Sequence, residues 1–199
     1  MVNLSFGIGA LGANLPSSEG EVVLTLRTAL AILHADPDIS ITAASRIWIT
    51  PAHPPGSGPD YANGVFLLKT SLTAESLLAR FHRIEADFGR DRSTGRWSAR
   101  VLDMDLIDLG GQIAPDAQTA GFWASLPEER QRVEAPDRLI LPHPRIQDRG
   151  FVLAPLAEIA PNWRNPLTGR SVVQMLDGLG PADLAGMHPM NGAKKQAFP

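Results

Sequence analysis

The 199-residue sequence contains no cysteine. This absence excludes disulfide bonds and thiolate metal sites, and it agrees with the cytoplasmic location that we expect, because the cytosol keeps thiols reduced. No apolar run approaches the roughly 20 residues that a membrane-spanning helix needs. The apolar N-terminus also lacks the basic region of a signal peptide. We therefore expect no membrane partner.

The sequence also lacks a strong excess of either charge. Its 18 Lys and Arg residues face 21 Asp and Glu residues, which gives a net charge of −3. Such a balance provides no general attraction for nucleic acid, so we expect none as a partner. An anionic ligand would have to meet a local cluster of positive charge. The sequence has such a cluster of four arginines: Arg90, Arg92, Arg96 and Arg100.

The order of apolar patterns predicts an α+β fold. Alternating or β-branched residues predict strands over 3–9, 39–50, 64–70 and 101–109, and helical spacing predicts helices over 22–35 and 73–88. Ser18 and Glu21 resemble a capping box for the first helix, and Thr73 is expected to cap the second. This order is typical of a ferredoxin-like βαββαβ core with an antiparallel sheet. The fold itself predicts no function, because it hosts many.

Two segments fall outside this core. Residues 115–138 are polar and show no strand period, so we expect an inserted loop with a short helix near 127–133, and loops of this length are often functional. Further short helices are expected from Phe151 and over 172–179, within a single domain of residues 1–180. Residues 181–199 carry Gly, Pro and Lys and are expected to form a flexible tail.

Two carboxylates stand one residue apart in an apolar strand. Asp103 and Asp105 belong to the run VLDMDLIDL, and residues i and i+2 of a strand point to the same face, roughly 7 Å apart. Such a pair is costly to desolvate, and divalent cations with phosphate oxygens would remove the cost. Clustered arginines beside the acids are what a magnesium–polyphosphate site requires. Asp108 has the opposite parity and receives no such role.

These patterns leave alternatives open. Both acids could face water or pair with arginines, and the arginines could form a solvated basic loop, because a short motif alone often matches by chance. Gly7, Gly9 and Gly12 match a GxGxxG pattern after a strand. We reject a dinucleotide-binding interpretation, because no acid ends a second parallel strand.

Five ordered segments resemble the 6-hydroxymethyl-7,8-dihydropterin pyrophosphokinase family. RWSARVLDMDLI resembles the family signature, usually written around RWGPRTLDLDIL. The other segments are GANL at 12–15, TP at 50–51 with PDYAN at 59–63, RIEADFGR at 83–90 and LPHPRIQDRGFVLAPLAEIAP at 141–161. The resemblance covers roughly residues 4–161 without the insertion, and several ordered motifs are more specific than one.

The resemblance implies an activity. Members of the family transfer the diphosphate of ATP to the hydroxymethyl group of 6-hydroxymethyl-7,8-dihydropterin in folate biosynthesis, and they release AMP. It implies that Asp103 and Asp105 bind two Mg²⁺ ions. With these acids, the catalytic residues that it implies are Arg90, Arg92 and Arg100. No general base is assigned, because a loose transition state needs alignment more than deprotonation.

The resemblance also implies two groups of substrate-binding residues. Those on the ATP side are Glu85, Arg92, Trp97, Arg100, His143 and Arg149, with Trp97 on a mobile loop. Those on the pterin side are Thr50, Tyr61, Asn63 and Phe151. Tyr61 and Phe151 would stack on the pterin, and Asn63 would read its edge. Phe151 considered alone is expected in the core. We expect ATP and the pterin as the only partners, and a monomer.

The sequence departs from the family at Ser98 and Ala99, where many relatives have Gly-Pro, and this difference bears on loop closure. The insertion could reach the nucleotide or stay on the surface. One alternative function is another magnesium-dependent nucleotidyl- or glycosyltransferase, which would not release AMP. A second is a non-catalytic binding module of the same fold, whose affinity for ATP would be indifferent to magnesium.

Overall fold

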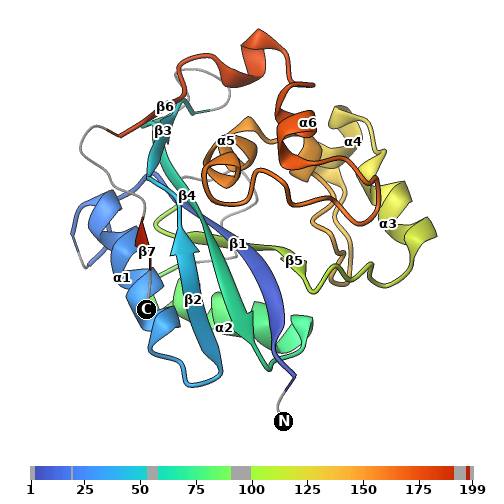
Figure 1. Cartoon of the computed structure of the whole chain (residues 1–199). Helices are drawn as coiled ribbons and strands as arrows, with labels where there is room; N and C mark the ends of the chain where they lie inside the picture. The colour runs from blue at the N-terminus through green and yellow to red at the C-terminus, as the bar shows by residue number, and fades with distance from the viewer. Residues whose placement is uncertain (1–2, 19, 53–57, 91–99, 191–195, 198–199) are drawn as a thin grey trace.

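The computed structural model in Figure 1 describes residues 3–18, 20–52, 58–90, 100–190 and 196–197. Its core elements follow one another as β1 (Ser5–Ala13), α1 (Val22–His34), β2 (Ile39–Ala44), β3 (Trp48–Thr50), β4 (Tyr61–Thr70), α2 (Ala74–Asp87) and β5 (Asp103–Leu109). The sheet order is β5-β1-β4-β2, with all neighbours antiparallel. This arrangement confirms the α+β class and the antiparallel sheet. None of the described helices has the length and apolar character that crossing a membrane requires.

Helices cover both faces of the sheet (Figure 1). On one face, α1 and α2 bury a larger core in which Phe81 packs edge-on against Phe66 of β4, with ring centroids 5.8 Å apart. On the other face lie α5 (Gly150–Ile159) and α6 (Val172–Leu176). There Val152 and Leu156 of α5 are buried in a smaller cluster with Val65 of β4. The smaller cluster leaves part of this second face available for a site.

The predicted strand over 39–50 is two strands in the structure. After β2, the backbone N–H of Arg46 donates to Glu158 of α5 at 3.0 Å, and the side-chain Nε of Arg46 donates to the same carboxylate at 2.8 Å. The indole of Trp48 in β3 also donates to Glu158, at 3.1 Å. Because an N–H that bonds a side chain is lost to the ladder, the strand is interrupted at this point. Glu158 thereby ties β3 to α5.

The two helix starts differ from each other. Thr73 caps α2 as predicted, since its hydroxyl accepts a hydrogen bond from the N–H of Ser76. The predicted capping box of Ser18 and Glu21 is wrong: Glu21 is itself the N-cap of α1 and makes no side-chain cap bond. Instead, the hydroxyl groups of Ser17 and Thr25 bond to each other at 2.6 Å. This hydroxyl contact links the chain before α1 to the first turn of the helix.

The glycines of the GxGxxG pattern lie inside β1, where they permit close packing. A Cβ atom at Gly9 would collide with the ring of Phe66, and one at Gly12 would collide with the side-chain oxygen of Asn63. Both neighbours of β1 are antiparallel to it, whereas a dinucleotide-binding fold needs parallel strands. The structure therefore agrees with the rejection of that interpretation.

The inserted segment 115–138 contains two helices, α3 (Ala117–Ala124) and α4 (Glu128–Val133). The helix expected near 127–133 is confirmed as α4, and α3 was not predicted. Asp116 caps α3 by accepting a hydrogen bond from the N–H of Thr119 at 2.8 Å. The short length of α3 and its internal Gly121 weaken the helical pattern in the sequence.

The C-terminal segment pairs with two strands of the sheet. β6 (His188–Pro189) pairs with β3, and β7 (Gln196–Ala197) pairs with β2. The N–H of Met190 also donates to the carbonyl of Ile47 at 2.8 Å. The division into a domain of residues 1–180 and a flexible tail of 181–199 stays a prediction. Removing the strands that pair with β2 and β3 tests it.

We expect that a chain ending at Gly180 has a lower free energy of unfolding than the full chain. The shorter chain loses the hydrogen bonds that pair β6 with β3 and β7 with β2. If each of the two pairings contributes about 1 kcal/mol net, the free energy of unfolding falls by about 2 kcal/mol. Urea denaturation measures it. A chain ending at Met190 is the matched control, because it keeps β6 and loses only β7. Equal unfolding midpoints for all three chains would show that the segment is a flexible tail.

Asp108 is buried near the end of β5, beyond an irregularity in the pairing of β5 with β1. Burial raises the pKa of its carboxyl group, although the N–H groups of Gly111 and Trp163 oppose the shift. The folded state therefore binds this proton more tightly than the unfolded chain. Ionisation of Asp108 then costs stability as the pH rises through the unfolded and the folded pKa values.

Asp108→Asn removes this ionisation. We expect the free energy of unfolding of the variant, relative to that of the unchanged protein, to be higher at pH 7 than at pH 4. Urea denaturation at the two pH values measures the difference. A relative stability that does not change with pH would contradict the shifted carboxyl group.

Candidate active site

Asp103 and Asn63 lie on the same face of the sheet, on either side of β1. Gly12 is the cross-strand partner of both residues. Two strand spacings separate them, which is roughly 10 Å. Next along β1, Ala10 pairs with both Asp105 and Val65, and Val65 is buried with α5. The two acids and Asn63 therefore face the α5 side, and Gly12 places no side chain between them.

Asp103 is held by two arginines. Arg90 and Arg100 donate to different oxygens of its carboxylate. Arg90 also donates to Glu85, a carboxylate of α2 that is only 1% exposed. The backbone N–H of Met104 donates to the same oxygen of Glu85 at 2.8 Å. Glu85 was predicted on the ATP side, and the structure places it behind Arg90, where it joins α2 to β5.

Asp105 is held by the segment that precedes α5. The guanidinium of Arg149 donates to its carboxylate at 2.8 Å, and the imidazole of His143 lies 3.9 Å from the same oxygen. Burial opposes the ionisation of Asp105, but His143 and Arg149 outweigh it and hold the pKa of the acid below its ordinary value. Burial and the charge of Arg149 lower the pKa of His143. Near neutral pH, a carboxylate therefore faces an uncharged imidazole.

The alternative in which the acids pair with arginines is thus what the structure contains. Such pairs do not exclude a metal–phosphate site, because carboxylates and guanidinium groups are the partners of metals and phosphates respectively. In the part of the chain that the structure describes, no cluster of three or more His, Asp or Glu side chains could hold a metal. Two carboxylates alone fit Mg²⁺, which keeps water and takes phosphate oxygens as further ligands.

The residues predicted to bind the pterin lie on β3, β4 and α5. The side-chain amide of Asn63 donates to the hydroxyl of Thr50 at 2.7 Å, and both side chains are buried. Tyr61 pairs with Thr50 across β3 and β4. Phe151 is 38% exposed at the start of α5, with the guanidinium of Arg149 5.5 Å from its ring centroid. The structure thus contradicts the core position expected for Phe151 taken alone.

Asn14 is a site residue that sequence reasoning missed. Its side-chain oxygen accepts a hydrogen bond from the N–H of Arg100 at 2.8 Å, and its amide donates to the carbonyl of Pro59 at 3.3 Å. The N–H of Asn14 in turn donates to the carbonyl of Arg100 at 2.9 Å. This buried side chain therefore connects an arginine of the acid site with the segment that precedes Tyr61. Its place in the GANL segment was the available signal.

Two predicted residues, Arg92 and Trp97, lie outside the described residues. The same holds for Arg96 and for the unusual pair Ser98 and Ala99. Their roles stay predictions.

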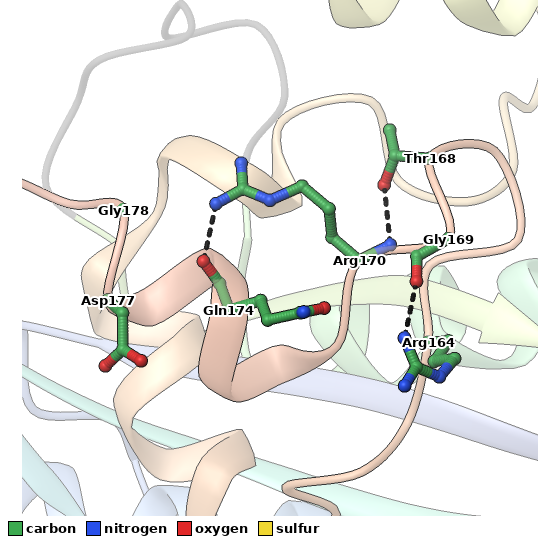
Figure 2. A pocket seen from close by; sticks show the side chains of 7 residues that line it. All are labelled: Arg164, Thr168, Gly169, Arg170, Gln174, Asp177 and Gly178. Carbon is green, nitrogen blue, oxygen red and sulfur yellow. Dashed lines mark hydrogen bonds between the residues drawn. The ribbon is translucent and has the colours of Figure 1, made fainter.

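A separate depression of about 620 Å³ lies in the loop before α6 and along that helix (Figure 2). Its arginines donate to backbone carbonyls of the same region: Arg164 to Gly169 at 2.9 Å, and Arg170 to Gln174. Its lining residues are distinct from those around Asp103 and Asp105. We therefore assign the chemistry to the acid–arginine cluster.

Comparison with known proteins agrees with this geometry. A family model described as 7,8-dihydro-6-hydroxymethylpterin-pyrophosphokinase (HPPK) matches residues 8–161. A 2-amino-4-hydroxy-6-hydroxymethyldihydropteridine pyrophosphokinase of Synechocystis is 36% identical over 167 residues, which are 84% of this chain and 72% of that protein. A protein of the same name from Pseudomonas aeruginosa is 33% identical over 167 residues, covering 84% of this chain and 87% of its own.

A crystal structure of Plasmodium falciparum HPPK-DHPS has a similar fold, with a TM-score of 0.62 at 13% identity. The match covers 88% of this chain and 43% of the Plasmodium chain, so this chain spans less than half of that protein. The fold, the ordered motifs and the match over residues 8–161 agree with one another. The chain belongs to the 7,8-dihydro-6-hydroxymethylpterin-pyrophosphokinase family.

Proposed function

We propose that this chain transfers the diphosphate of ATP to the hydroxymethyl oxygen of 6-hydroxymethyl-7,8-dihydropterin and releases AMP, as a step of folate biosynthesis. One observation carries the proposal. Asp103 and Asn63 pair with the same residue, Gly12, on one face of the sheet. An acid–arginine cluster for a polyphosphate therefore lies roughly 10 Å from an amide and aromatic cluster for a flat heterocycle. An ATP terminus and a pterin could meet over Gly12.

On the phosphate side, Arg90, Arg100 and Arg149 are expected to exchange their carboxylate partners for phosphate oxygens. A guanidinium group binds carboxylate and phosphate oxygens in the same forked geometry, so each arginine keeps an anionic partner after the exchange. Arg92 and Trp97 would join this side by resemblance. An uncharged His143 can donate one hydrogen bond to a phosphate without adding charge.

Asp103 and Asp105, freed from the arginines by the same exchange, would hold two Mg²⁺ ions. When bound, these ions would neutralise charge on the triphosphate as the oxygen between its α- and β-phosphorus atoms leaves. Glu85 would act indirectly, because it holds Arg90 and the N–H of Met104 and so orients the arginine.

On the pterin side, Asn63 and Thr50 offer buried hydrogen-bonding groups. Their mutual bond at 2.7 Å fixes the amide orientation, so that the remaining amide positions can read a heterocycle edge. Tyr61 and Phe151 would stack on the pterin faces. The exposure of Phe151 supports this role, because a ring that served the core would be covered.

In the reaction, the hydroxymethyl oxygen forms a bond to the β-phosphorus, and the bond from that phosphorus to the α,β-bridging oxygen breaks. AMP leaves with the electron pair, and the hydroxyl proton passes to water. We assign no general base, because a loose transition state demands alignment of the two oxygens. The arginines contribute that alignment.

We also propose that the protein acts as a monomer in the cytoplasm. The absence of cysteine suits a reducing compartment.

The proposal is tested by incubating the protein with ATP, Mg²⁺ and the reduced hydroxymethylpterin, and by separating the nucleotide products. We expect AMP and a pterin diphosphate in equal amounts. Formation of ADP, or nucleotide turnover that does not need the pterin, would overturn the proposal. Transfer to a nucleotide or sugar would support a different transferase.

Asp105→Ala is expected to lower kcat by about 10³-fold or more, the scale on which lost charge stabilisation acts in phosphoryl transfer. The matched control is Asp177→Ala, which removes an exposed carboxylate from the end of α6 and should leave kcat unchanged. Circular dichroism checks that both variants fold. A folded Asp105→Ala protein with full activity would disprove the metal assignment.

A further inference from the structure

The segment between His143 and Arg149 sends two side chains into the inserted helices. The guanidinium of Arg145 donates to the backbone carbonyl of Gln131 in α4 at 2.6 Å. The side-chain amide of Gln147 donates to the carbonyl of Ala124 in α3 at 3.1 Å. The two contacts join parts of the chain that are 14 and 23 residues apart.

Both acceptors lie at helix C-termini. Ala124 is the last residue of α3, and Gln131 belongs to the last turn of α4. The final carbonyls of a helix have no partner within the helix, so a donor from elsewhere stabilises the helix end. A cation such as Arg145 gains further from the negative end of the helix dipole. The segment from His143 to Arg149 therefore supplies a capping group to each inserted helix.

The insertion is closed at its base and packed within. Ala114 and Leu141 exchange two backbone hydrogen bonds of 2.9 and 3.1 Å where the insertion leaves and rejoins the core. Inside it, the side chain of Gln131 donates to the carbonyl of Leu126 at 2.6 Å, and the Leu126 side chain is buried. Gln131 thus ties α4 to the loop that connects it to α3, and the guanidinium of Arg130 in α4 lies 5.8 Å from the ring centroid of Phe122 in α3. Arg145 and Gln147 attach to these two helices.

The attachment points stand between the two residues that meet Asp105. His143 precedes Arg145 by two residues, and Arg149 follows Gln147 by two. The buried side chain of Ile146 and a short 3-10 turn over Ile146–Asp148 leave this stretch little freedom. A displacement of Arg145 or Gln147 would therefore be transmitted to Arg149.

We propose that the inserted helices position the segment 143–149 for the triphosphate of ATP, with Arg145 and Gln147 as the positioning residues. This inference rests on the proposed function for the identity of the ligand. Neither residue touches the acids in the contacts described above. They act by holding Arg149 where it meets Asp105. The insertion thereby serves the nucleotide side of the site. Phe151 on the pterin side follows Arg149 by two residues, but it belongs to α5, which Val152 and Leu156 anchor in the smaller cluster.

The test uses Arg145→Met and Gln147→Leu, alone and together, in the full chain. Titration calorimetry with Mg-ATP should give a Kd about tenfold higher for the double variant, the scale on which loss of a group supporting a ligand acts. The KM for the pterin at saturating ATP should change less than twofold. Arg145→Lys keeps a cationic donor and should recover part of the affinity.

The matched control is Arg138→Met, which removes an exposed arginine at the end of the insertion that pairs with Asp137. It should leave the Kd for Mg-ATP unchanged. The inference is overturned if the double variant binds Mg-ATP as tightly as the unchanged protein. It is also overturned if Arg138→Met weakens binding equally, or if the pterin KM rises with the Kd, since either result means general destabilisation.

Failure of the proposed function is visible separately. It would appear as an unchanged protein that binds Mg-ATP but forms no AMP with the pterin. The calorimetric comparison would still decide whether Arg145 and Gln147 position the nucleotide side.

Discussion

The site depends on the repulsion between two carboxylates that stand two residues apart on β5 and face the α5 side of the sheet. Asp103 and Asp105 face the same side of the sheet, and each needs a positive partner there. The partners come from three segments: Arg90 follows α2, Arg100 lies just before β5, and Arg149, 44 residues from Asp105, precedes α5. Satisfying two charges therefore brings three segments to one place. The same cations are then available for phosphate groups.

Further contacts extend this arrangement across the sheet. Gly12 leaves the space between Asp103 and Asn63 free of a side chain, and Asn14, two residues later, fixes both Arg100 and the carbonyl of Pro59. Glu158 does the corresponding work for β3, which it ties to the same helix that begins with Phe151. The phosphate and pterin sides are thus held in a fixed relation by contacts that involve neither substrate.

Local patterns predicted the core elements and the shared face of the two acids, because strand parity and helical spacing are properties of neighbouring residues. They also predicted the Thr73 cap. The break between β2 and β3 could not be predicted, since it depends on Glu158, 112 residues away from Arg46. The same applies to the capping of α3 and α4 by Gln147 and Arg145. These contacts exist only once the chain has folded.

In the proposed function, Asp103 and Asp105 exchange their arginine partners for Mg²⁺ while the arginines bind phosphate. Magnesium-dependent binding of the nucleotide tests this exchange most directly. Calorimetry would use an ATP analogue with a methylene group between its α- and β-phosphorus atoms, which cannot be cleaved there, with Mg²⁺ or with a chelator. We expect the affinity to fall by about 10²-fold or more without Mg²⁺, and little magnesium dependence in a variant with Asp103→Asn and Asp105→Asn. Equal affinity with and without Mg²⁺ in the unchanged protein would contradict a metal role for these acids.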